Sequence, residues 1–196
     1  MRRLFAALLL ASLLVPMAAR AQDTPAGIRG ELIASMMDAG GKIQELATAI
    51  PDAKYTWKPS KDVRSVGQVF LHVVQENYMM PSFIGVKSTM SMDELMKLDT
   101  QTMEPAKVRQ MLKESYAWAQ KAVTDTPDSE LETQTDFFGQ KMTKRSVMLV
   151  LASHSHEHLG QLIAYARSNN IVPPWTAREQ AKKKAEEKKT AEKNGK

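Results

Sequence analysis

The stretch LASHSHEHLGQLIAYAR, residues 151–167, is the most informative part of this chain for both the fold and the candidate chemistry. It holds three of the four histidines, His154, His156 and His158, within the apolar repeat of an amphipathic helix. At about 100° per residue, His154 and His158 project from the apolar face, one turn apart. His156 lies about 200° from either neighbour and points elsewhere, toward solvent. The stretch therefore predicts a bundle helix with an inward pair of imidazoles.

These two inward imidazoles need partners, because a buried neutral ring loses its hydrogen bonds to water. A metal ion occupies both rings at once, and helix-borne sites such as H-E-x-x-H use the same i,i+4 spacing. The order in this chain is H-S-H-E-H, so Glu157 does not stand at the glutamate position of that motif. The pair therefore indicates a metal site of a different class from the H-E-x-x-H proteases.

The fourth histidine, His72, lies midway along a second predicted helix, in VGQVFLHVVQENY, residues 66–78. A lone histidine in such an apolar stretch is usually a hydrogen-bonded core residue. However, every inward-facing histidine of the chain lies on these two helices. A ring from one helix that meets the His154/His158 pair of the other would form a three-nitrogen site. Such a site leaves a coordination position open, as in catalytic metal centres.

The rest of the chain is predicted to be helical as well. Gly40 and Gly41 interrupt the first helical segment and leave room for a kink, and a short hairpin centred on Gly139 precedes the last segment. Four helices without a convincing sheet predict an all-α fold, a four-helix bundle of the up-and-down type. The four segments with the apolar repeat are residues 27–50, 66–80, 105–123 and 144–169.

The N-terminus, MRRLFAALLLASLLVPMAARAQ, has the three parts of a secretory signal. Two arginines precede an apolar run over residues 4–15, and Ala19-Arg20-Ala21 forms an A-x-A cleavage site. The run is shorter than the roughly 20 residues that span a bilayer, so we expect no stable membrane insertion. The prediction is cleavage after Ala21 and a periplasmic or secreted protein, with residues 22–175 as its single domain.

Charge is distributed unevenly along the chain. Of the 27 Lys and Arg, three precede residue 22 and eight lie in residues 176–196, which also hold four of the 22 Asp and Glu. Residues 22–175 therefore keep 16 bases and 18 acids, and no nucleic-acid-binding surface is expected. Alanine is the only apolar residue type in residues 177–196, which predicts a solvated tail that is disordered or transiently helical. The chain has no cysteine, which excludes disulfides, a thiolate nucleophile and Cys-ligated zinc.

With these motifs in this order, the sequence resembles the DinB-like (DinB/YfiT) four-helix-bundle superfamily. VGQVFLHVVQENY, HSHEHLGQLIAYAR and the preceding YTWKPSKDVRS carry the resemblance, which covers roughly residues 28–167. Its most specific element is H-x-x-x-H-x-G-Q, residues 154–161. The resemblance implies that His72, His154 and His158 bind zinc, nickel or a similar divalent ion, with iron and manganese as further options. The characterised branches of this superfamily include thiol-dependent transferases and isomerases, so the resemblance also implies chemistry of this kind.

Two further groups of residues are candidates for chemistry. Glu76 shares the helix face of His72, so it is a candidate general base or outer-sphere partner; a surface carboxylate is the alternative. Six methionines lie in residues 79–103, where thioethers either bind Cu(I) or fill gaps in a core.

The predicted function is a metal-dependent enzyme, a hydrolase or transferase acting on an unidentified small molecule. The alternatives are a non-catalytic periplasmic module that binds a metal or a small ligand, and a purely structural bundle. A homodimer is a candidate assembly.

Overall fold

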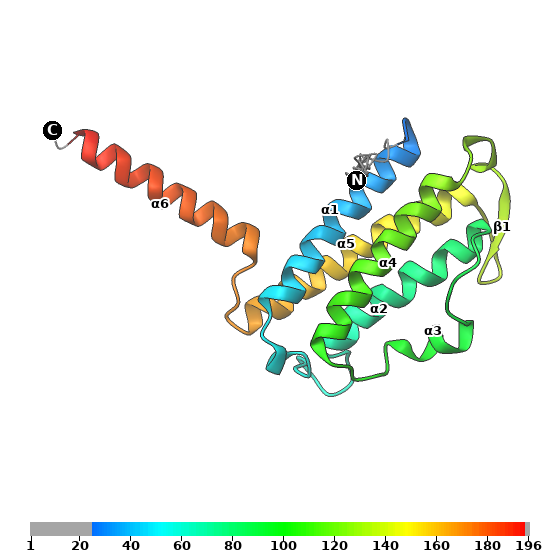
Figure 1. Ribbon diagram of the computed structural model, residues 1–196, viewed down its shortest axis with the longest axis horizontal. Helices are drawn as coiled ribbons and strands as arrows, with labels where there is room; N and C mark the ends of the chain where they lie inside the picture. Colours follow the sequence, from blue (N-terminus) through cyan, green and yellow to red (C-terminus); the bar gives the residue numbers. More distant parts are fainter. Residues whose placement is uncertain (1–24, 195–196) are drawn as a thin grey trace, which may run out of the picture.

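Four long helices form the core of the protein, whose computed structural model describes residues 25–194 (Figure 1). The predicted signal peptide lies outside the described residues. The predicted helices and the all-α fold class are confirmed, and a hydrophobic core fills the space between the helices. The four helices are α1 (Ile28–Ala49), α2 (Val66–Met79), α4 (Pro105–Asp125) and α5 (Lys144–Ser168).

Local sequence signals explain where these helices begin. Ser65 accepts a hydrogen bond from the Gln68 backbone while the Gln68 side chain bonds to the Ser65 backbone, which is a capping box at the start of α2. Thr143 caps α5 by accepting from the Ser146 backbone. Pro105 occupies the first turn of α4, where its missing N–H costs nothing.

Helix α1 continues unbroken through Gly40 and Gly41. A Cβ atom on Gly40 would lie 2.6 Å from Cε1 of Tyr116, a ring of α4 that is buried in the core. Gly40 therefore allows the Tyr116 ring to pack against the α1 backbone, and no kink is needed.

The helices do not alternate in direction as an up-and-down bundle requires. The Gly67 N–H donates to the Tyr55 carbonyl, which sets the start of α2 beside the end of α1. Arg29, at the start of α1, donates to the carbonyls of Thr124 and Thr126 at the end of α4. Helices α2 and α4 are therefore both antiparallel to α1 and run in the same direction (Figure 1).

The segment between α2 and α4 explains this difference from the predicted topology. It contains the 3-10 helix η2 (Met80–Ile84) and the short helix α3 (Met92–Leu98), and it returns the chain along the bundle to the end where α2 begins. Helix α3 was not predicted, although Ser91 and Glu94 form its capping box with the S-x-x-E signature.

The predicted hairpin is confirmed. Strands β1 (Gln134–Phe137) and β2 (Gln140–Thr143) pair in an antiparallel register that sets Phe137 opposite Gln140. The two-residue loop places Phe138 and Gly139 at φ 53° and 83°, the left-handed geometry of a tight hairpin turn.

The remaining elements are two short 3-10 helices and a C-terminal helix. They are η1 (Asp52–Lys54), η3 (Asp128–Glu130) and α6 (Pro174–Asn194), which projects away from the bundle (Figure 1). Composition predicted a disordered or transiently helical tail here, and alanine, lysine and glutamate are strong helix formers. Residues 177–193 of α6 are exposed. Within residues 25–194, none of the helices is both long and apolar enough to cross a membrane.

Candidate metal centre

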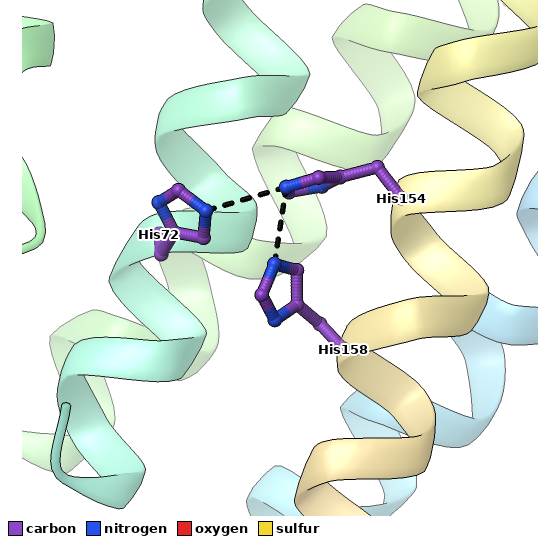
Figure 2. Close-up of side chains that lie close together, drawn as sticks. All are labelled: His72, His154 and His158. Carbon is purple, nitrogen blue, oxygen red and sulfur yellow. Dashed lines mark hydrogen bonds between the residues drawn. The ribbon is translucent and has the colours of Figure 1, made fainter. Parts of the chain in front are cut away.

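Three histidines meet between α2 and α5 (Figure 2). The Nε2 atom of His154 lies 3.3 Å from Nε2 of His72 and 3.0 Å from Nε2 of His158. All three can offer a ligand atom within 4.8 Å of the others. The structure thus brings together the three residues that the sequence predicted to converge, and their use as metal ligands remains a prediction.

The surroundings favour the neutral form of all three rings. Burial lowers the pKa of His154 to about 3, with further lowering from the neighbouring His158 and His72. Burial also lowers the pKa of His72 and the pKa of His158. Only 6% of the His158 surface is exposed. Neutral imidazoles keep one ring nitrogen unprotonated, which is the form that binds metal ions.

The outer nitrogens of two rings have acceptors. Nδ1 of His158 lies 2.8 Å from Oε1 of Gln161, and Nδ1 of His72 lies 3.1 Å from Oε1 of Gln75. Oδ2 of Asp99 is 3.3 Å from the same His72 nitrogen. Metal-binding histidines characteristically donate their other N–H to such a group, which orients the ring. The arrangement can therefore present Nε2 of both rings to one ion.

A model of the DinB family matches residues 17–190. The chain belongs to the DinB family. This confirms the resemblance carried by the histidine-bearing motifs.

Solved structures of DinB-like proteins share the fold. A protein from Bacillus cereus ATCC 10987 is 19% identical with a TM-score of 0.65, over 75% of this chain and 95% of that chain. The Bacillus subtilis protein YjoA is 16% identical with a TM-score of 0.59, over 72% and 93% of the two chains. A conserved protein from Enterococcus faecalis is 14% identical with a TM-score of 0.60, over 73% and 97%. None of the curated proteins matches this chain.

Glu76 lies one turn after His72 on α2 and is buried, with 7% of its surface exposed. Its carboxylate is not one of the groups that converge with the three histidines among the described residues of this DinB-family protein. Burial, with the negative charge of Asp99, raises the pKa of Glu76 to about 7. With 7% of its surface exposed, Glu76 is not a surface carboxylate. A pKa near 7 lets the side chain hold or release a proton near neutral pH.

His156 lies apart from the three converging histidines, as its position on the helix predicts. It is exposed, and its Nε2 lies 2.9 Å from the Ser35 hydroxyl and 3.1 Å from the Ser35 carbonyl on α1. His156 therefore joins α5 to α1.

Sequence reasoning missed Gln75, Asp99 and Arg64 around this DinB-family site. Gln75 had a usable signal, because His72-x-x-Gln75 repeats the spacing of His158-x-x-Gln161. Asp99 and Arg64 had no such signal, since Asp99 directly follows α3 and Arg64 precedes the cap of α2, outside both histidine-bearing helices. The structure alone reveals that Arg64 binds Asp99, with distances of 2.6 and 2.9 Å.

Proposed function

We propose that this DinB-family protein binds one divalent metal ion through His72, His154 and His158 and is a metal-dependent enzyme. The reaction is of the hydrolase or transferase type, and the substrate is a small molecule. Zinc, nickel and iron are the first candidate ions, because imidazole nitrogen suits all three, and manganese is a further candidate.

The convergence of three Nε2 atoms carries this proposal. Nitrogens that share one ion at roughly 2.0–2.1 Å lie about 3–3.5 Å from one another. His154 Nε2 is already 3.3 and 3.0 Å from its two neighbours. The donor set fits a divalent ion, since the rings are neutral and two of them have acceptors at Nδ1.

A divalent ion held by three neutral ligands supplies a Lewis acid with open coordination positions. The protein supplies the proton transfer. Glu76, whose pKa burial raises to about 7, is our candidate for taking a proton from the attacking group and returning it to the leaving group.

Metal analysis of purified protein tests the site. After separate reconstitution with zinc, nickel, manganese and iron, we expect one bound ion per chain with at least one of these metals. His154→Ala and His158→Ala should lose the ion, and His156→Ala, which removes a histidine outside the group, should keep it. Wild-type protein that stays metal-free after every reconstitution would contradict the proposal.

An activity screen separates an enzyme from a binding module. Metal-loaded protein should show esterase, amidase or thiol-transfer activity above that of metal-free protein. Glu76→Gln should lower turnover by about 10²–10⁴-fold, the usual contribution of a general base, while metal content stays unchanged. Metal binding without turnover on any substrate class would support the non-catalytic alternative.

We also propose that the protein is exported. The basic, apolar and A-x-A segments of residues 1–21 support this. The mature protein should begin at Gln22 and appear in the periplasmic fraction or the medium. An intact N-terminus in a cytoplasmic fraction would refute export without affecting the metal site.

A further inference from the structure

A chain of hydrogen bonds connects the outer nitrogen of His158 to a loop residue. Nδ1 of His158 is 2.8 Å from Oε1 of Gln161, and Nε2 of Gln161 donates to the Tyr165 hydroxyl over 3.1 Å. The Tyr165 hydroxyl in turn donates to the Arg64 carbonyl over 3.2 Å. Three side chains of α5 are therefore linked in series to Arg64, which precedes the cap of α2.

The Arg64 carbonyl, at the end of this series, determines which group donates and which accepts in every hydrogen bond of the series. A carbonyl oxygen only accepts, so the Tyr165 hydroxyl must use its single proton to donate to Arg64. The hydroxyl then accepts from Gln161, which must present its NH₂ group to Tyr165 and its carbonyl to His158. His158 must therefore carry its proton on Nδ1, and its Nε2 is left with a lone pair.

The side chain of Arg64 acts on His72, which lies on α2. The Arg64 guanidinium, which only donates, holds Oδ2 of Asp99 through Nε and Nη2 at 2.9 and 2.6 Å. That oxygen lies 3.3 Å from Nδ1 of His72. A carboxylate only accepts, so it favours the proton on Nδ1 of His72. Gln75 also bonds to this nitrogen, but an amide can turn either end toward it.

We infer that Arg64 is a positioning residue that sets the tautomers of both His72 and His158, through its guanidinium and its carbonyl respectively. Both rings then present Nε2 lone pairs to the same point. His154, whose Nε2 lies between them, is the ring that must donate from Nε2 in metal-free protein. The consequence for metal affinity rests on the proposed function, whereas the tautomers themselves do not.

Nitrogen-15 NMR of histidine-labelled, metal-free protein at pH 8 tests the assignment. We expect Nε2 of His72 and His158 to show the chemical shift of an unprotonated ring nitrogen, and Nε2 of His154 to show that of a protonated one. The opposite tautomer at either His72 or His158 would overturn the inference. This measurement is independent of metal binding.

Tyr165→Phe tests the relay, because it removes one hydroxyl that touches no histidine. Gln161 then loses the partner that orients it, so the Nε2 signal of His158 should shift toward a mixture of tautomers while His72 is unchanged. The metal dissociation constant should rise roughly 2- to 10-fold, the effect of one lost hydrogen bond. Tyr55→Phe, which removes a buried hydroxyl bonded to the Ala47 carbonyl, is the matched control and should change neither quantity.

Two further variants separate positioning from general destabilisation. Gln161→Leu should raise the dissociation constant about 10–100-fold, and Gln161→Glu, which keeps an acceptor, should restore the His158 tautomer. Arg64→Ala keeps the backbone carbonyl, so it should disturb His72 and spare His158. Equal disturbance of both rings by Arg64→Ala, or no rescue by Gln161→Glu, would contradict the assigned roles.

Discussion

At the residue scale, Gly40 and Gly41 are neighbours in α1 with opposite surroundings. A Cβ atom on Gly40 would lie 2.6 Å from the buried Tyr116 ring, whereas one on Gly41 would meet nothing within 4 Å. We expect Gly40→Ala to lower the free energy of unfolding by about 1–3 kcal/mol through overpacking. Gly41→Ala should raise it by roughly 0.5–1 kcal/mol through helix propensity. Urea denaturation measures both, and equal effects would contradict the packing role of Gly40.

Glu76 makes a second prediction at this scale, on the pH dependence of stability. Its pKa is raised to about 7 by burial, so between its ordinary value and pH 7 the folded state binds more protons than the unfolded state. The free energy of unfolding therefore falls as pH rises through this window, by about 3 kcal/mol for a shift of this size. Glu76→Gln removes this contribution.

The measurement is urea denaturation of metal-free protein between pH 5 and pH 8. The free energy of unfolding of Glu76→Gln relative to wild type should rise with pH from pH 5 to about pH 7 and then level off toward pH 8. Taking the difference cancels the opposite contribution of His154, whose depressed pKa makes the folded state lose stability as pH falls. A difference that does not change with pH would show that the Glu76 carboxyl is solvated.

At the element scale, α6 is joined to the bundle mainly at its first turn. Trp175 packs against the core, whereas residues 177–193 are exposed and Arg178 pairs with Glu45 at the surface. Deleting residues 177–196 should change the free energy of unfolding by less than about 1 kcal/mol, since an exposed ion pair contributes little. Deleting residues 174–196 also removes Trp175 and should cost more. Thermal denaturation compares the two, and equal losses would contradict this division of α6.

At the scale of the whole molecule, a metal bound to α2 and α5 should stabilise the entire bundle. Binding to the folded state alone adds about 2.7 kcal/mol at a free metal concentration 100 times the dissociation constant. The melting temperature should therefore rise with zinc or nickel concentration in wild type and in His156→Ala. The melting temperature of His72→Ala should not rise with metal concentration. A rise as large as that of wild type would refute ligation by His72.

Much of this molecule follows from local patterns. The apolar repeats predicted the four core helices, and the i,i+4 spacing predicted that His154 and His158 share a face. The same repeats could not show that α2 and α4 run in parallel. Periodicity identifies the buried face of a helix but not its direction, which depends on the path of the segment between α2 and α4.

Residue type and helical spacing are local properties, so the amino-acid sequence alone shows which residues are able to bind a metal. The packing of the helices brings His72 to the pair on α5, buries the three rings so that they stay neutral, and sets Asp99 and Arg64 beside His72. Those features depend on distances between segments up to a hundred residues apart in the chain. Such distances arise when the packed helices exclude water, and no local pattern records them.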